Sequence, residues 1–279
     1  MSAPAADLTV RSGMDAVTPG RLVARCWLGP GVLGVWIRPR RPVSFLAGQH
    51  VMLARGEGVA RTYSIANLPQ EAARDGLEFH VRVYPGGAMS EWLAGAAPGA
   101  RLRIGPPAGD CCYRPGAREA ALLLAGTGTG IAPLAAIARD ALAQGHPRPV
   151  VVVQGASTHG RLYLTSCDTL PGAARLPPPA GHRGAAAIAA WRTCVRSAGQ
   201  DIVAAVTGEL ASLGDPGDVR AFLCGGPGSV TAMRRALFLA GMPPGHIRAD
   251  EFLPAARAAT GRPGSRHVPG GQAGPDRGQ

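Results

Sequence analysis

The sequence predicts two domains in series, a small antiparallel β-domain (a barrel or a sandwich) followed by an α/β domain with a parallel sheet. Three observations lead to this prediction. The chain has 279 residues, which is enough for one or two compact cores. Short apolar runs broken by glycine and proline fill residues 21–113. From about residue 120 onward, strand-like runs alternate with helical patterns.

The first half supplies the strands of the predicted β-domain, which we place at residues 18–115 after a flexible arm at 1–17. Several of its apolar runs alternate with polar residues, as half-buried strands do. The expected strands are the runs at 32–37, 50–53, 77–84 and 101–104. One helix, at 89–94, is expected to interrupt them.

The second half alternates strands with helices, which is typical of a parallel sheet, and we place this domain at 116–256. The expected strands are the runs at 120–124, 150–153, 221–223 and 247–250. The expected helices span 131–144, 202–213 and 230–240. Residues 171–191, rich in proline and alanine, fit neither pattern. Residues 257–279 lack apolar periodicity and are expected to form a disordered tail.

The charge of the chain narrows the choice of partners. Its 29 basic residues, all arginine, outnumber 18 acidic residues and give a net charge of +11. Nucleic-acid binding is not expected, because the arginines are scattered and aromatic residues make up only 5% of the chain. The basic surface favours anionic ligands or an acidic protein partner.

The cysteines and the apolar runs exclude further classes. The six cysteines are Cys26, Cys111, Cys112, Cys167, Cys194 and Cys224. They show neither CxxC nor Cx4CxxC spacing, so we expect no metal or iron–sulfur site. The longest uncharged run, 120–138, contains three glycines and a proline, which favours a strand, loop and helix over a membrane span. Residues 1–20 lack the apolar core of a signal peptide, and we expect a cytoplasmic protein without a transmembrane segment.

The first candidate site is the run Arg61, Thr62, Tyr63 and Ser64, directly after a strand-like run. It offers a guanidinium for phosphate, a flat ring for stacking and a hydroxyl donor within four residues. In an extended segment, Arg61 and Tyr63 share one face and Ser64 takes the other. The competing interpretation is an exposed edge strand with a packed tyrosine.

The second candidate is a glycine-rich turn before the short predicted helix. It consists of Gly86, Gly87, Ala88, Met89 and Ser90. Backbone N–H groups at a helix N-terminus bind anions, and glycine allows a close approach. The competing interpretation is a simple turn with Ser90 as the helix cap.

The third candidate lies between a predicted strand and a predicted helix. It consists of Gly126, Thr127, Gly128, Thr129 and Gly130, with Pro133 in the first turn of the helix. Dinucleotide folds bind a diphosphate at this point, although the spacing falls short of a full GxGxxG. A tight strand–helix turn is the competing interpretation.

Two further candidates lie at the carboxyl ends of predicted parallel strands, the edge at which such sheets bind ligands. The first group is Cys224, Gly225, Gly226 and Pro227, and the second is Asp250, Glu251, Phe252 and Leu253. The competing interpretations are a small buried cysteine and an ordinary C-terminal segment.

In this order and spacing, the motifs resemble the ferredoxin–NADP reductase superfamily. The likeness is stronger to bacterial FAD-dependent reductase components of oxygenase and ferredoxin systems that lack an iron–sulfur domain. It covers about residues 20–254 and is supported by the segments 45–50, 105–113 and 238–241. The resemblance implies a Greek-key β-barrel that binds flavin, followed by an α/β parallel-sheet domain that binds the nicotinamide nucleotide.

The resemblance also implies roles for the flavin side of the site. Arg61 would contact a flavin phosphate, Tyr63 would stack on the isoalloxazine ring, and Ser64 would hydrogen-bond near its N5 atom. The backbone amides of residues 87–90 would hold the FAD diphosphate, which favours FAD over FMN.

On the nucleotide side, the resemblance implies that residues 127–133 face the diphosphate of the pyridine nucleotide. Cys224 and Gly225 would line the nicotinamide pocket, and Glu251 and Phe252 would close the flavin face. The catalytic candidates are therefore Ser64, Cys224 and Glu251.

The function that follows is hydride transfer from NADH or NADPH to FAD, and then electron transfer to a separate ferredoxin, flavodoxin or oxygenase component. Ser157 stands where relatives that use NADPH often carry arginine, which leans towards NADH, although His159 and Arg161 remain close enough in sequence to reach a 2′-phosphate. The alternatives are a free-flavin or quinone reductase and a non-catalytic flavin- or nucleotide-binding subunit.

Overall fold

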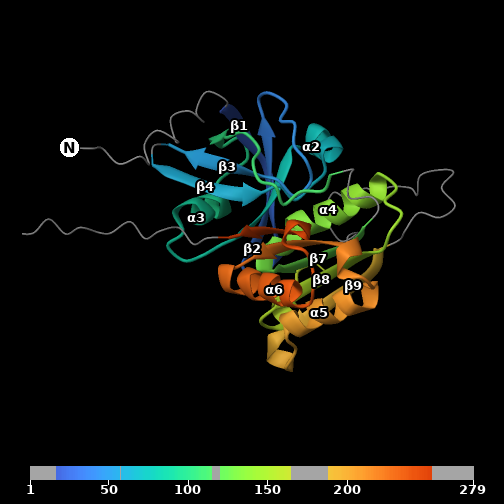
Figure 1. Cartoon of the computed structure of the whole chain (residues 1–279). Coiled ribbons are helices and arrows are strands. Elements are labelled where there is room, and N and C mark those ends of the chain that lie inside the picture. The colour runs from blue at the N-terminus through green and yellow to red at the C-terminus, as the bar shows by residue number, and fades with distance from the viewer. Residues whose placement is uncertain (1–16, 57, 115–119, 165–187, 253–279) are drawn as a thin grey trace, which may run out of the picture.

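A computed structural model describes residues 17–56, 58–114, 120–164 and 188–252 of the chain (Figure 1). These residues form an antiparallel sheet followed by a separate parallel sheet, so the predicted fold class is confirmed. The predicted tail, most of the predicted arm and most of the segment 171–191 lie outside the described residues. The predicted domain boundary at 115/116 also lies outside them and stays a prediction.

The antiparallel sheet has six strands in the order β4-β3-β6-β1-β2-β5. The strands are β1 (Thr18–Gly29), β2 (Val32–Pro39), β3 (His50–Arg55), β4 (Val59–Ser64), β5 (Leu77–Arg82) and β6 (Arg101–Ile104). The two outer strands meet where Ile65 pairs with Phe79, which closes the sheet into a barrel. After a long connection from β5, β6 returns to lie between β1 and β3, as in a Greek key.

Alternation of apolar and polar residues explains most of the barrel. In β6, Leu102 and Ile104 are buried while the arginines beside them are exposed, as expected of a strand with one face in the core. The helix α3 (Ala88–Gly95) packs Met89 and Leu93 against this core. In β5, by contrast, both faces are buried, because the second domain covers the outer one.

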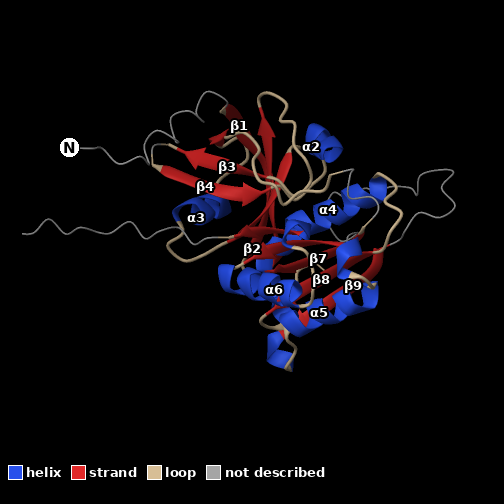
Figure 2. Ribbon diagram, in the orientation of Figure 1, coloured by secondary structure: helices blue, strands red, loops and turns tan. Residues whose placement is uncertain are grey.

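The parallel sheet has five strands in the order β11-β10-β7-β8-β9. The strands are β7 (Ala121–Thr127), β8 (Val150–Ala156), β9 (Ile188–Val195), β10 (Val219–Gly225) and β11 (Ile247–Glu251). The helix α4 (Ile131–Ala143) covers one face, and α5 (Ile202–Leu213) and α6 (Pro227–Leu239) cover the other (Figure 2). Covered faces on both sides explain the continuous apolar runs in β7 and β8. None of the described helices has the length and apolar character needed to cross a bilayer.

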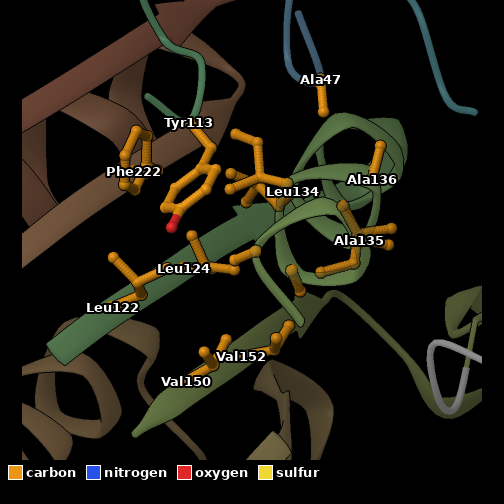
Figure 3. Packing of buried hydrophobic residues seen from close by; sticks show 14 of the residues in the cluster. Ala47, Tyr113, Leu122, Leu124, Leu134, Ala135, Ala136, Val150, Val152 and Phe222 are labelled. Atoms are coloured by element: carbon orange, nitrogen blue, oxygen red, sulfur yellow. The ribbon is translucent and has the colours of Figure 1, made fainter. Parts of the chain in front are cut away.

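One apolar core spans the boundary between the two sheets. Ala47 and Leu68 of the barrel pack with α4 and the sheet beneath it, as does Tyr113. Tyr113 belongs to residues 105–114, which follow β6 and which we call the closing segment. Figure 3 shows Tyr113 between Phe222 of β10 and Leu134 of α4. Burying these side chains together holds the two domains in a fixed relation.

Four elements differ from the sequence predictions, and each difference has a physical reason. The strand β1 was not predicted, because its outer half is exposed and lacks alternation. The helix α2 (Pro69–Asp75) buries none of its residues, so no apolar stripe marks it. The strand β9 begins inside the segment that fitted no pattern. The run Arg61–Ser64 lies within β4 rather than after a strand.

Candidate active site

The order in which the chain adds strands to the parallel sheet reverses between β7 and β10. From β7 the chain adds β8 and β9 on one side, and then returns to add β10 and β11 on the other. Ligands of such sheets bind in the crevice at the carboxyl ends of the strands where the order reverses. The glycine-rich segment after β7 and the Cys224 segment after β10 both lie at this point.

These two segments touch each other through their glycines. A Cβ atom added to Gly130 would lie 2.5 Å from the carbonyl carbon of Cys224, and one added to Gly225 would overlap the side chain of Thr127. Gly225 also has a φ of +143°, which disfavours a side chain. Gly128, in contrast, has open space in front of it. Gly130 and Gly225 therefore permit close packing of the two loops, and Gly128 leaves the crevice open.

The run Arg61–Ser64 forms the end of β4, an outer strand of the barrel sheet. Tyr63 is half-buried and meets Phe79 edge to face, with ring centroids 6.4 Å apart. Burial raises the pKa of Tyr63 to about 12, so its phenol is neutral at physiological pH. The guanidinium of Arg61 donates to the carbonyl of Ala60, and Thr62 is exposed. The edge strand and the packed tyrosine of the competing interpretation are thus both present, yet the Tyr63 ring keeps part of its surface open.

The turn before α3 presents backbone donors beside β4. Gly87 is the N-cap, and the first helical bond runs from the N–H of Glu91 to the carbonyl of Gly87. The N–H groups of Ala88, Met89 and Ser90 precede this bond and point out of the helix end. The hydroxyl of Ser90 accepts from the N–H of Tyr84 and donates to Gly87, so Ser90 braces the turn and is not its cap. The Met89 side chain is buried in the barrel core, which leaves only its backbone for a ligand.

An acid from the second domain reaches the end of β4. The hydroxyl of Ser64 donates to Oδ2 of Asp250 at 3.4 Å, and Nδ1 of His50 lies 3.5 Å from the same oxygen. Asp250 belongs to β11, whereas His50 and Ser64 are direct partners across β3 and β4. These three side chains connect the barrel to the carboxyl edge of the parallel sheet.

The acid beside Ser64 is Asp250, which precedes the candidate Glu251 in the same motif. Glu251 is exposed and accepts a hydrogen bond from Thr231 at 3.5 Å. Successive residues of a strand point to opposite faces, so only one of the two acids can face the barrel. The sequence contained the pair of acids, but choosing between them needed the register of β11.

The thiol of Cys224 is fully buried. Its Sγ lies 3.7 Å from Sγ of Cys111, which belongs to the closing segment of the barrel. The hydrogen bond with Cys111, together with burial, raises the pKa of the Cys224 thiol well above its usual range. Cys224 therefore lies at the predicted strand end as a neutral thiol, in the small buried form of the competing interpretation.

The remaining predicted residues lie along the same edge of the sheet. The backbone N–H of Phe252 donates to the carbonyl of Gly225 at 2.8 Å, which places Phe252 beside the end of β10. Gly226 is the N-cap of α6 and Pro227 is its first residue. Thr127 and Thr129 are half-buried at the open end of β7, and Pro133 is buried in α4. All of these residues thus lie at the carboxyl edge of the parallel sheet, whereas residues 86–90 lie beside β4.

Comparison with known proteins agrees with this geometry. Residues 37–113 match the family of oxidoreductase FAD-binding domains. The ferredoxin–NAD(P)(+) reductase component of the naphthalene 1,2-dioxygenase/salicylate 5-hydroxylase systems of Ralstonia sp is 31% identical over 220 residues. The corresponding component of the naphthalene 1,2-dioxygenase system of Pseudomonas putida is 30% identical over 222 residues. Each alignment covers 78% of this chain, and the chain spans 63% of the length of each relative.

The solved structure of a ferredoxin reductase in carbazole 1,9a-dioxygenase superposes with a TM-score of 0.66. It is 27% identical, and the match covers 85% of this chain and 69% of that one. The chain has the ferredoxin–NADP reductase fold, and its residues 37–113 are similar to an oxidoreductase FAD-binding domain. The predicted resemblance is confirmed. The matched residues of the FAD-binding domain include Tyr63 and Ser64 and end at Tyr113, close to the end of the barrel half.

Proposed function

We propose that this chain is a flavin-dependent NAD(P)H oxidoreductase that transfers a hydride from NADH or NADPH to FAD. It then passes electrons to a separate redox protein, which is a ferredoxin, a flavodoxin or an oxygenase component. The observation that carries the proposal is the contact of Ser64 with Asp250. This contact joins the ring-binding end of β4 to the edge of the parallel sheet where a nucleotide binds.

The residues along β4 and α3 fit FAD. The half-open ring of Tyr63 offers a stacking surface, with the cationic Arg61 two residues away on the same strand. The N-terminal end of α3 adds backbone donors next to β4. A molecule with both a flat ring system and a diphosphate uses all three features, whereas FMN, with a single phosphate, uses fewer. When bound, FAD supplies the redox chemistry, and the protein supplies binding and orientation.

Each side chain of β4 then has a distinct task. Arg61 binds phosphate through a charge-assisted hydrogen bond. Tyr63 stacks as a neutral phenol, because its pKa lies at about 12. The carboxylate of Asp250 orients the Ser64 hydroxyl towards the domain boundary. Thr62 is exposed and contributes through its backbone.

The pyridine nucleotide fits the crevice at the carboxyl edge of the sheet. The N-termini of α4 and α6 both open there, and their backbone N–H groups favour an anionic diphosphate. Gly128 leaves room for this approach, and the neutral Cys224 packs behind the edge. His159 and Arg161, both exposed, follow β8 and are the residues we assign to the choice between NADH and NADPH.

We place this reaction in the cytoplasm. The five cysteines in the described residues are all free thiols, as in proteins of a reducing compartment. The same compartment supplies reduced pyridine nucleotides. The basic surface favours an acidic redox partner, and the encounter with such a partner is expected to slow as salt is added.

Anaerobic stopped-flow mixing of the purified, FAD-loaded protein with NADH or NADPH tests the proposal. We expect the flavin absorbance to bleach with at least one of the two nucleotides. A protein that holds flavin and bleaches with neither nucleotide would contradict the proposal and favour a non-catalytic binding subunit. Turnover with free FMN or a quinone, and with no ferredoxin, flavodoxin or oxygenase component, would favour the free-flavin or quinone reductase.

A further inference from the structure

A histidine that is not among the predicted site residues lies next to the site. His50 is the first residue of β3, and its side chain is 25% exposed. Its Nδ1 lies 3.5 Å from Oδ2 of Asp250, whose side chain is 21% exposed. The same oxygen accepts the hydrogen bond from Ser64. Three groups that can carry a proton therefore form a line from β4, across the domain boundary, to water.

The backbone fixes the imidazole in this position. The N–H of His50 donates to the carbonyl of Ala108, and the N–H of Ala108 donates back to His50, at 3.0 and 2.8 Å. Gly109, with a φ of +98°, lies against the ring, and a Cβ atom there would approach the ring to 3.0 Å. A side chain at position 109 would displace the imidazole of His50, so the glycine leaves room for this ring.

Groups from two other strands face His50. Asp250 faces it from β11, and Ser64 faces it from β4. Asp110 follows two residues after Ala108, the backbone partner of His50, and its carboxylate is paired with Arg248 at 3.7 Å. Cys224, which is adjacent to Asp250 across β10 and β11, is held neutral. The carboxylate of Asp250 is thus the group best placed to exchange a proton with His50.

We propose that His50, acting through Asp250, relays a proton between Ser64 and solvent. Ser64 Oγ gives its proton to Asp250 Oδ2 as it accepts another from the site. Asp250 passes the proton to Nδ1 of His50, and the imidazole releases one from Nε2 to water. The neutral ring then carries its proton on Nδ1, and exchange of this proton for one on Nε2 through water restores the starting tautomer. Ser64 and Asp250 are then also in their starting states, so one proton crosses per cycle. The contacts of 3.4 and 3.5 Å are long, as such contacts often are before the ligands bind.

This relay rests on the proposed function, because flavin oxidation releases protons as well as electrons. His50 touches neither substrate nor cofactor and works through Asp250, which makes it a positioning residue. Imidazole is the side chain that changes charge most readily near neutral pH, which suits it to the solvent end of the line.

The first test is chemical rescue of the His50→Ala variant. The assay is NAD(P)H-dependent reduction of ferricyanide, expressed per bound flavin, so that no protein partner is needed. We expect turnover to fall about tenfold to hundredfold, with KM for the nucleotide unchanged. Added imidazole should restore turnover in a concentration-dependent way, because it fits the space vacated by the ring. A loss without rescue, or no loss, would overturn the relay.

Arg248→Ala is the matched control. It removes another contact between the same two segments, two residues before Asp250, and leaves the line of three groups intact. We expect its turnover to equal that of the wild type and to be indifferent to imidazole. If the wild type itself oxidises no NAD(P)H, the proposed function fails. If the wild type oxidises NAD(P)H but the His50→Ala variant is unaffected, or is impaired and not rescued by imidazole, the relay is refuted and the proposed function stands.

A second test needs no activity. In the protein with ¹³C-labelled histidine, His50→Gln identifies the ring resonance of His50 by its disappearance. We expect that resonance to move at fixed pH when Asp250 is changed to Asn, and to stay in place in Arg248→Ala. A resonance that ignores Asp250→Asn would show that the two side chains do not interact.

Discussion

Two carboxylate–imidazole pairs lie at the domain boundary, and they differ in every property that matters for function. Glu78 and His80 of β5 are 2.9 Å apart, with side chains 5% and 0% exposed. Asp250 and His50 are 3.5 Å apart and between a fifth and a quarter exposed. The first pair has a short contact and is shielded from water, whereas the second has a longer contact and is partly exposed. The first therefore suits a fixed joint and the second a site that exchanges protons.

The neighbours of the two pairs support this contrast. Nδ1 of His80 lies 3.1 Å from the hydroxyl of Tyr163, which belongs to the second domain. Burial raises the pKa of the Tyr163 phenol, so the phenol stays protonated. Nearby, Arg139 of α4 forms an ion pair with Glu71 of the barrel half. We call the contacts of Glu78, His80 and Tyr163 the closed side of the boundary, and those of Ser64, Asp250 and His50 the open side.

The largest expected effect separates the two sides by stability. His80→Leu leaves the Glu78 carboxylate buried and unpaired, which should lower the free energy of unfolding by about 3–5 kcal/mol. His50→Leu makes the same chemical change at the open side, where the expected loss is about 1 kcal/mol or less. Urea unfolding of both variants measures the difference. Equal losses of unfolding free energy would mean that the two pairs contribute equally to stability, which would contradict the contrast between the two sides.

The second effect concerns binding on the open side. Arg61→Gln removes a charged donor from β4, and FAD affinity should fall about tenfold to hundredfold, in line with about 1.5–3 kcal/mol for such a bond. Stability without FAD should be nearly unchanged, because within the described residues the Arg61 side chain forms a single hydrogen bond, to the adjacent carbonyl of Ala60. Equilibrium titration of the flavin-free protein with FAD measures the affinity. Arg248, another arginine near the domain boundary, provides the control. The Arg248→Gln variant should bind FAD with the affinity of the wild type.

The third effect tests the packing of the two loops. Gly130→Ala places a methyl group against the backbone of Cys224, which should cost about 1–3 kcal/mol and slow flavin bleaching by NAD(P)H. Gly160→Ala is the matched control, because a Cβ atom there meets open space. Thermal unfolding and stopped-flow bleaching together measure the two variants. Equal behaviour of the pair would show that the loops do not need their close approach.

The smallest effect is a pH dependence carried by Tyr63. Its pKa is about 12 in the folded chain, against about 10 in an unfolded one. Above pH 10 the unfolded chain releases this proton first, so stability falls as pH rises from about 10 through about 12. The Tyr63→Phe variant should show a shallower decline over that window, measured by urea unfolding at several pH values. Parallel curves for the two proteins would place the Tyr63 ring in water.

The sequence was informative wherever the signal was local. Strands such as β6 and helices such as α5 follow from alternation and periodicity, and their predicted bounds match those of the structure. The glycine-rich motifs were also correctly expected at the ends of strands, which are β7 and β10. The helix α2 was not predicted because none of its residues is buried. A helix without a buried face has no periodic pattern of apolar residues that would indicate it.

The sequence was uninformative where a contact joins distant residues. Ser64 and Asp250 are 186 positions apart, and His50 joins them only through the pairing of β3 with β4. Cys111 meets Cys224 across 113 positions, which spacing alone does not show. In each case the partner depends on register and on how the domains pack. The motifs therefore marked the candidate segments, whereas the pairing of Ser64 with Asp250 could not be predicted from them.

The most direct test of the central claim is a crystal structure of the FAD-loaded protein. We expect the flavin ring to stack on Tyr63, with one edge at Ser64 and Asp250 and the diphosphate at the N-terminus of α3. The open face of the ring should look towards the crevice between β7 and β10. A flavin bound elsewhere, or a Tyr63 ring with no space beside it, would contradict the account.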